Sequence, residues 1–261
     1  MSAWRLYLSL GNTSVRWAAD RDAHWVAEGA APPDPPLSLP GVAEQCARAG
    51  LAPGELSAVV ACASTADLQP WREAVRKAWD RGLQVLGHDF PAPLRTRYGD
   101  PAELGPDRAA NALGALAAGL VPALILDAGT CLTADVVDAT GLHRGGAIAP
   151  GLPAMRAGIL RVAPHLAPAC PSLPLMSPNE SPGLDTAENL AWGWLWALSG
   201  AARQMIAHLR GVTDPPARAI LTGGDAQLLA SLLPDTEATV WPRLTLEGLR
   251  EAYRHVEEGE R

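Results

Sequence analysis

Cysteine and histidine are scarce in this sequence. The four cysteines lie far apart and form no C-x-x-C pair, a usage that fits reduced thiols in a reducing compartment. They are Cys46, Cys62, Cys131 and Cys170. The six histidines are scattered as well and show no paired metal-ligand spacing. A structural zinc site is therefore not expected.

Long apolar runs and basic blocks are also lacking. No stretch of about 18 apolar residues is present to cross a bilayer. The start, MSAWRLYLSL, has no small-residue cleavage site and favours a first strand over a signal peptide. The 21 basic residues are outnumbered by 28 acidic ones, and no Lys/Arg-rich block is present to neutralise a phosphate backbone. We therefore expect a cytoplasmic protein that binds neither membranes nor nucleic acid.

The residues that are present are ordinary for a soluble globular protein, with 48% apolar and 19% charged side chains. Residues 4–27 alternate apolar runs with turn residues, which predicts an antiparallel meander, and a proline-rich connector, GAAPPDPPLSLP, ends it. The pattern then predicts a helix over residues 41–49, a strand in LSAVVACA, a helix in LQPWREAVRKAW and a strand in LQVLG. We predict an α/β fold from this order.

The second half of the chain begins like the first. After a helix near residues 106–119, strands are predicted in ALILDAGT, CLTADVVD and LHRGGAIAP, and later in RAILTGGDA. LSLGNTSV matches LDAGTCLT through a strand, a glycine (Gly11 or Gly129) and a hydroxyl or amide residue after it. This likeness favours an internal duplication. The alternative is that two glycine hairpins arose independently.

Both glycine turns are candidate phosphate-binding sites. A glycine at the bend lets backbone N–H groups approach an anion, because no Cβ keeps the phosphate away. Each turn is therefore able to cradle one end of a triphosphate. If the two turns face each other across a cleft, the two halves form a phosphate clamp. Asp127 ends a buried strand, where a carboxylate can hold a cation, and Thr130 can donate its hydroxyl to a phosphate oxygen. Either motif alone is weak, since glycine hairpins are commoner than nucleotide sites.

The segment YGDPAELGPDRAANALGAL contains a candidate general base. Pro106 suits the first turn of a helix, so Asp107 and Arg108 fall at its N-terminal end, with Asn111 one turn further on the same face as Asp107. The helix dipole favours the ionised carboxylate, and the guanidinium offers a fork of donors to a substrate carboxylate or phosphate. The alternative is helix capping with a surface ion pair.

Residues 185–210 form the strongest predicted helix. It begins with Asp185 or Thr186 as N-cap and follows the long proline-rich loop APHLAPACPSLPLMSPNESPG, which is typical of a binding segment or a disordered one. Trp192 and Trp196 make its second side apolar, which indicates a partner subunit or a central core helix. The later Gly-Gly turn in AILTGGDA either admits a flat ligand such as a nucleoside or is a plain strand-to-helix turn.

Taken together, these segments resemble the type III pantothenate kinases, members of the actin, hexokinase and acetate kinase superfamily. The matching pieces are LGNTSVRW, YGDPAELGPDRAANALGA, LDAGTCLTADVVDATGLHRGGAIAPGLPAMRAGI, GLDTAENLAWGWLWALSGA, LTGGDA and RLTLEGL. They span nearly the whole chain, and the third is the most specific in its length and glycine placement.

The resemblance implies two ribonuclease-H-like lobes, residues 1–115 and 116–261, the second with a dimerisation helix. It implies a homodimer that transfers the γ-phosphate of ATP to pantothenate, forming 4′-phosphopantothenate in the first step of coenzyme A biosynthesis. It also implies Mg²⁺ with the ATP and a monovalent cation, K⁺ or NH4⁺.

The resemblance also implies a role for particular residues. Asp107 corresponds to the catalytic proton acceptor, and Asp127 to the ligand of the monovalent cation. The implied substrate-binding residues are Tyr98, Gly105, Pro106, Asp107, Arg108 and Thr186. The implied ATP-binding residues are Ser9, Leu10, Gly11, Asn12, Thr13, Ser14, Val15, Arg16 and Thr130.

The chain departs from the family pattern in its first turn. Ser9 stands where the family has an aspartate that acts close to magnesium and the phosphates, Arg16 stands where lysine is frequent, and Pro106 stands where a smaller, flexible residue is usual. A serine supplies only a hydroxyl ligand or a water bridge. Losing one catalytic electrostatic contact costs roughly 3 to 4 kcal/mol, which leaves a poor kinase rather than none. The alternatives are a non-catalytic homologue that binds nucleotide or a pantothenate-like ligand in a regulatory role, and a kinase of another small alcohol.

Overall fold

The structure is a computed structural model that describes residues 3–64, 67–173, 175 and 182–259. The chain folds into two compact units. The first comprises Met1–Gly119 and Arg243–Arg261, and the second comprises Leu120–Pro242. The predicted division after residue 115 assigned the C-terminal segment to the second lobe. The structure instead places it in the first, because the C-terminal helix packs along a helix of that unit.

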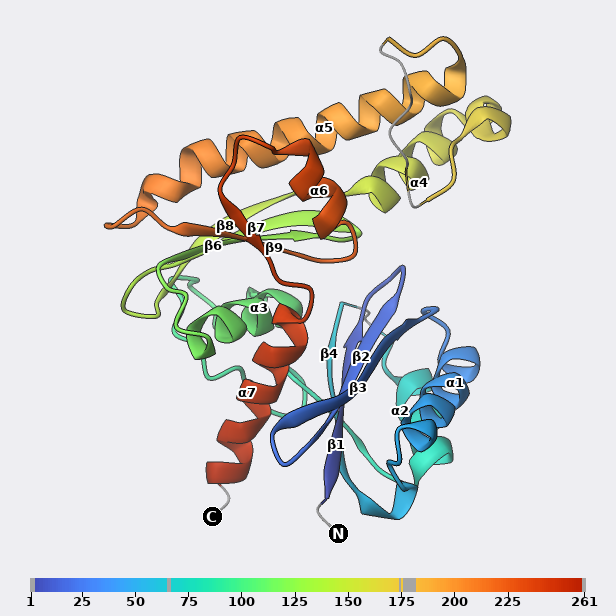
Figure 1. Cartoon of the computed structure of the whole chain (residues 1–261), viewed down its shortest axis with the longest axis vertical. Helices are drawn as coiled ribbons and strands as arrows, with labels where there is room; N and C mark the ends of the chain where they lie inside the picture. Colours follow the sequence, from blue (N-terminus) through green and yellow to red (C-terminus); the bar gives the residue numbers. More distant parts are fainter. Residues whose placement is uncertain (1–2, 65–66, 174, 176–181, 260–261) are drawn as a thin grey trace. The chain divides into compact units, whose positions relative to one another are not determined.

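The first unit is built on a five-stranded mixed sheet (Figure 1). Its meander consists of the antiparallel strands β1 (Trp4–Leu10), β2 (Val15–Arg21) and β3 (His24–Ala31). Strands β4 (Leu56–Ala63) and β5 (Leu83–Val85) extend the sheet in parallel beyond β1, which gives the order β3-β2-β1-β4-β5. The predicted meander and both later strands are confirmed.

Four α-helices are described in the first unit, with two short 3-10 turns. They are α1 (Pro35–Arg48), α2 (Gln69–Trp79), α3 (Pro106–Ala117) and α7 (Leu244–Gly259), and the turns are η1 (Pro53–Glu55) and η2 (Pro101–Glu103). The predicted proline-rich connector is largely wrong, because β3 extends to Ala31 and α1 begins at Pro35. Proline fixes φ near the helical value and lacks an N–H, so it suits a first turn where that donor has no partner within the helix.

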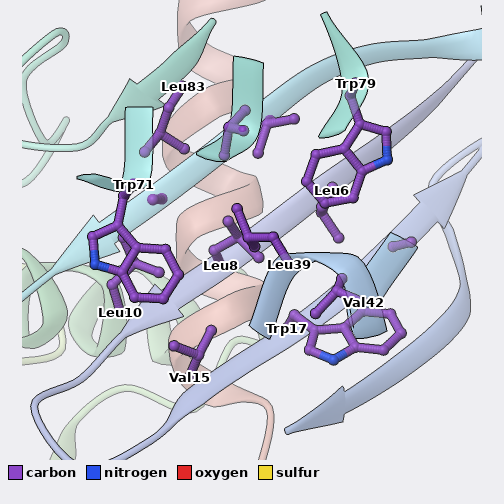
Figure 2. Close-up of a cluster of buried hydrophobic side chains, with 14 of the residues drawn as sticks. Leu6, Leu8, Leu10, Val15, Trp17, Leu39, Val42, Trp71, Trp79 and Leu83 are labelled. Carbon is purple, nitrogen blue, oxygen red and sulfur yellow. The ribbon is translucent and has the colours of Figure 1, made fainter. Parts of the chain in front are cut away.

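The two faces of the first sheet bury different side chains. The even-numbered residues of β1, among them Leu6 and Leu8, pack with Trp71 and Trp79 of α2 in the cluster of Figure 2. Tyr7 belongs to a second cluster that includes residues of α3 and α7. Because side chains alternate along a strand, Ser9 lies on the face that α3 and α7 cover.

The second unit repeats the strand order of the first. Strands β6 (Ala123–Ala128), β7 (Cys131–Val137) and β8 (His143–Pro150) form an antiparallel meander, and β9 (Arg218–Thr222) and β10 (Ala238–Val240) extend it in parallel beyond β6. The order β10-β9-β6-β7-β8 has the connectivity of the first sheet read from its opposite edge. The same topology in both units supports the predicted duplication and confirms the α/β fold of two ribonuclease-H-like units.

The helices described in the second unit cover one face of its sheet (Figure 1). They are α4 (Leu152–Val162), α5 (Thr186–Leu209) and α6 (Ala226–Leu232), with the 3-10 turns η3 (Pro164–Ala169) and η4 (Arg210–Val212). Leu124, Leu126 and Ala128 point to this face, so the alternation along β6 directs Asp127 to the opposite one. Residues 174 and 176–181 of the predicted long loop lie outside the described residues.

Helix α5 matches its prediction. The Asp185 side chain caps it by accepting a hydrogen bond from the backbone N of Glu188 at 2.8 Å. Trp194 is buried in the core, whereas Trp196 is 55% exposed and stacks on Trp192 with a centroid distance of 5.5 Å. One side of α5 is therefore a core surface and the other presents an exposed aromatic ring. Among the residues that the structure describes, no helix is both long and apolar enough to span a bilayer.

Candidate active site

The β1–β2 turn is tight and tied to the end of β4. Gly11 N donates to Ser14 O at 3.1 Å, and a Cβ at Gly11 would lie only 2.8 Å from that oxygen, so the turn requires a glycine. The backbone N of Ser64 donates to Leu10 O at 3.0 Å. The side chains of residues 12–14 are exposed. The turn therefore presents polar groups to solvent from a fixed backbone.

Helix α3 places Asp107 in its first turn, as predicted. Asp107 Oδ1 accepts from the backbone N of Arg108 at 2.8 Å, and Oδ2 accepts from Ser64 Oγ at 2.9 Å. Two donors thus orient a half-buried carboxylate that belongs to the first unit. Sequence reasoning missed Ser64. The available signal was its position directly after the carboxyl end of a buried parallel strand, where α/β proteins place functional groups.

Arg108 is a buried residue and does not lie on the surface. Its side chain is 6% exposed, and Nη1 donates to the phenol oxygen of Tyr98 at 2.9 Å. The guanidinium carbon also lies 5.8 Å from the centroid of the same ring. The structure therefore brings together Tyr98, Arg108 and Asp107, three of the residues that the sequence singled out for substrate binding.

In the second unit, backbone segments that contain glycine lie close to Asp127. Gly129 N donates to Cys131 O at 3.0 Å and closes the β6–β7 turn. Gly223 has a φ of +97°, and a Cβ there would collide with Asp127 Oδ1 and with the carbonyl oxygen of Ala128. Gly151 cannot carry a side chain either, because its Cβ would strike the backbone of the same turn. The glycines let three backbone segments meet beside the carboxylate.

Two hydroxyls flank Asp127 on the same face of the sheet. Thr133 of β7 and Thr222 of β9 are its ladder partners, which places their Cβ atoms beside its own. The hydroxyl oxygens of both are buried and have no hydrogen-bond partner, and Thr222 is fully buried. One carboxylate and two hydroxyls are the oxygen donors that a hard cation prefers. The residues present therefore fit the cation that the sequence predicted at Asp127, and sequence reasoning missed both threonines.

The turn in AILTGGDA lies beside the same strand end. It connects β9 to α6, and Asp225 N donates to Ala128 O at 2.9 Å. Burial raises the pKa of the Asp225 carboxyl above its usual range. Thr130 accepts a hydrogen bond at its carbonyl from Gly151 N at 3.0 Å, and Thr186 is the first residue of α5. The predicted site residues thus divide between the units, with Thr130, Asp127 and Thr186 in the second.

Comparison with known families identifies the family of the chain. The family model described as type III pantothenate kinase matches residues 5–208, which is most of the chain. The chain belongs to the type III pantothenate kinase family. The predicted resemblance is confirmed.

Individual members of the family match over different lengths. The type III pantothenate kinase of Halorhodospira halophila is 30% identical over 96% of this chain and 98% of its own. That of Thermomicrobium roseum is 37% identical over 64% of this chain and 62% of its own length. That of Phenylobacterium zucineum is 28% identical and covers 95% of this chain and 97% of its own.

Solved structures at low sequence identity show the fold alone. The activator of the 2-hydroxyisocaproyl-CoA dehydratase from Clostridium difficile, bound to ADPNP, has a TM-score of 0.58 at 14% identity and covers 98% of this chain and 97% of its own. Component A of the (R)-2-hydroxyglutaryl-CoA dehydratase from Acidaminococcus fermentans has a TM-score of 0.57 at 13% identity over the whole of both chains.

Proposed function

We propose that this member of the type III pantothenate kinase family transfers the γ-phosphate of ATP to the primary hydroxyl of pantothenate. The product is 4′-phosphopantothenate, which enters coenzyme A biosynthesis. The observation that carries the proposal is the Asp107 carboxylate at the tip of α3, held by Ser64 and adjacent to buried Arg108, which is paired with half-buried Tyr98. A carboxylate fits this reaction because the loose transition state of phosphoryl transfer needs a proton acceptor only late.

The first unit supplies the acceptor side of the reaction. Asp107 accepts the proton of the alcohol. Arg108 binds the carboxylate of pantothenate through its guanidinium, and the hydrogen bond to Tyr98 helps to keep the guanidinium plane in place. Gly105 and Pro106 shape the N-terminal end of α3. The family resemblance alone assigns Thr186, the first residue of α5, to substrate binding.

Each unit, taken by itself, offers groups that suit a nucleotide. Residues 9–16 line the phosphates with the backbone of the β1–β2 turn, and Thr130 donates its hydroxyl to a phosphate oxygen. Asp127, Thr133 and Thr222 hold a monovalent cation, K⁺ or NH4⁺, since their single negative charge balances one positive charge. Mg²⁺, when bound with ATP, would neutralise the negative charge that develops on the phosphates. Ser9 offers this ion a hydroxyl or a bridged water.

We propose a cytoplasmic homodimer. The exposed side of α5, with Trp196 stacked on Trp192, supplies an apolar surface for a second subunit. The four cysteines are free thiols, which suits a reducing compartment.

A substrate screen tests the reaction. ADP release is measured with pantothenate, with sugars and with polyols. The proposal predicts release that depends on pantothenate and K⁺. Release with another alcohol and none with pantothenate would assign the same site to a different substrate.

One observation favours a second candidate function, a non-catalytic binding protein: the neutral Ser9 in place of a carboxylate. Its signature is ATP binding by folded protein without ADP release from any alcohol. In that case, activity gained on Ser9→Asp would identify the lost carboxylate as the cause.

A further inference from the structure

The segment RLTLEGL has a defined place in the first unit but no role in the reaction proposed above. It contains the start of α7, which packs against α3 (Figure 1). Helix α3 carries Asp107 in its first turn and Asn111 one turn later. The segment is therefore next to the helix that supplies the proposed proton acceptor.

Reciprocal glycines set the contact between the two helices. A Cβ at Gly248 of α7 would collide with the carbonyl oxygen of Ala110 on α3. A Cβ at Gly114 of α3 would in turn meet the carbonyl oxygen of Leu244 on α7. In each helix, a glycine thus contacts a backbone carbonyl of the other helix. The two helices therefore approach each other more closely than larger residues would allow. This contact fixes the position of the residues one turn earlier on each helix.

Those residues are Thr245 and Asn111, and they are linked by a hydrogen bond. Thr245 Oγ1 donates to Asn111 Oδ1 at 2.7 Å. The same hydroxyl accepts a hydrogen bond from Arg16 Nη2 at 3.2 Å. Thr245 is 1% exposed and Asn111 is fully buried, so the link is protected from water. A hydroxyl suits this place because it donates and accepts at once.

The link joins two parts of the proposed site. Arg16 follows the β1–β2 turn and is the cross-strand partner of Ser9. Because Ser9 is neutral, the ladder neighbour of Arg16 offers the guanidinium no opposite charge, and Thr245 supplies a neutral partner from another element. One buried hydroxyl thereby connects the end of the turn to the helix that carries Asp107.

We propose that Thr245 is a positioning residue that holds the Arg16 guanidinium in the orientation that binds ATP. The part that concerns ATP rests on the proposed function. Without the Thr245 hydroxyl, the Arg16 side chain has more conformational freedom in the free protein and loses more of it when the nucleotide binds. We expect this loss to raise the KM for ATP by about three- to tenfold. The kcat changes by less than about twofold, because Thr245 touches no reacting group.

The kinetic test compares Thr245→Val, which keeps the shape and loses the hydroxyl, with Thr245→Ser, which keeps the hydroxyl. We expect Thr245→Val to raise the KM for ATP and to leave the KM for pantothenate unchanged. Thr245→Ser should keep the KM for ATP at the wild-type value. Thr213→Val is the matched control, since Thr213 is also buried and its hydroxyl donates to a backbone carbonyl, that of Pro215, at 2.9 Å. An unchanged KM for ATP in Thr245→Val, or an equal rise in the control, overturns the proposal.

A second measurement needs no turnover and separates this proposal from the proposed function. The thermal midpoints of Arg16→Met, Thr245→Val and the double variant form a double-mutant cycle. If Thr245 holds Arg16, the loss in the double variant is smaller than the sum of the two single losses. Additive losses overturn the link, whatever the activity. A sub-additive cycle in a protein without kinase activity keeps the link and rejects the proposed reaction.

Discussion

Ser64 donates a hydrogen bond from its Oγ to Oδ2 of Asp107 over 2.9 Å, so the residue that directly follows β4 orients the carboxylate at the tip of α3. The two residues are 43 positions apart in the sequence. Their contact ties the proposed proton acceptor to the same strand end that holds the β1–β2 turn through Ser64 N.

We predict that Ser64→Ala lowers kcat by about five- to tenfold, because a hydrogen bond to a charged but half-exposed carboxylate contributes about 1 kcal/mol of orientation. The KM for pantothenate stays within about twofold. Steady-state kinetics measure both. Ser64→Thr keeps the hydroxyl and restores kcat, and Ser57→Ala, at the opposite end of β4, leaves kcat unchanged. An unaffected kcat in Ser64→Ala would exclude an orienting role.

Restoring a carboxylate in the first turn is predicted to speed the reaction. Ser9→Asp adds a negative charge close to the site proposed for Mg²⁺ and the phosphates, and we expect kcat to rise by about two decades. Ser9→Asn has nearly the same shape without the charge and serves as control. The measurement is kcat as a function of Mg²⁺ concentration. A gain of equal size in both variants, or none in Ser9→Asp, would contradict a missing-charge explanation.

The cation proposed at Asp127 is expected to stabilise the second unit. At a K⁺ concentration about tenfold above the dissociation constant, binding raises the thermal midpoint by roughly 2 to 5 °C relative to Na⁺ at equal ionic strength. Thr222→Val removes one buried hydroxyl and reduces this shift, Thr222→Ser retains it, and Asp127→Asn abolishes it. Thr213→Val controls for the loss of a buried hydroxyl. A full K⁺ shift in Thr222→Val would remove that residue from the site.

Asp20 gives a predicted pH dependence of stability. Burial raises the pKa of its carboxyl above the usual 3.8, and the nearby Arg5 opposes the shift without cancelling it. Between the unfolded and the folded pKa, Asp20 is therefore protonated in the folded protein and ionised in the unfolded chain. The stability from this group is complete below the unfolded pKa and is lost as pH rises through the folded pKa.

Asp20→Asn cannot titrate, so its free energy of unfolding relative to wild type should increase as pH rises from about 4 to 8. Urea unfolding at several pH values measures the difference. Asp138→Asn is the control: although desolvation acts in the opposite direction, hydrogen bonds from Thr140, Leu142 and Arg144 lower the pKa of Asp138 to about 2. Its difference from wild type should be flat above about pH 5. A flat difference for Asp20→Asn as well would refute the raised pKa.

Local patterns in the sequence were sufficient to predict most helices and strands and the helix start that carries Asp107. The alternation in β1 and β2, the buried run of β4, and Pro106 at the start of α3 each specify their own structure through neighbouring residues. The proline-rich start of α1 was missed because Pro35 is compatible with both a connector and a first helical turn.

The residues that orient the site were not predictable in the same way. Thr245 contacts Asn111 across 134 positions and Arg16 across 229, and a single threonine produces no period or spacing that would indicate such contacts. The placement of α7 was missed for a related reason, because an amphipathic pattern indicates a buried face but not the sheet that buries it. Long-range packing decides these features.

The formation of 4′-phosphopantothenate tests the central claim most directly. Wild type and Asp107→Asn are incubated with ATP, Mg²⁺, K⁺ and pantothenate, and the product is quantified by mass spectrometry, with ATP binding measured in parallel. The account predicts product from wild type, and at least about a hundredfold less from Asp107→Asn with ATP binding retained. Equal product from both proteins, or none from wild type that binds ATP, would contradict it.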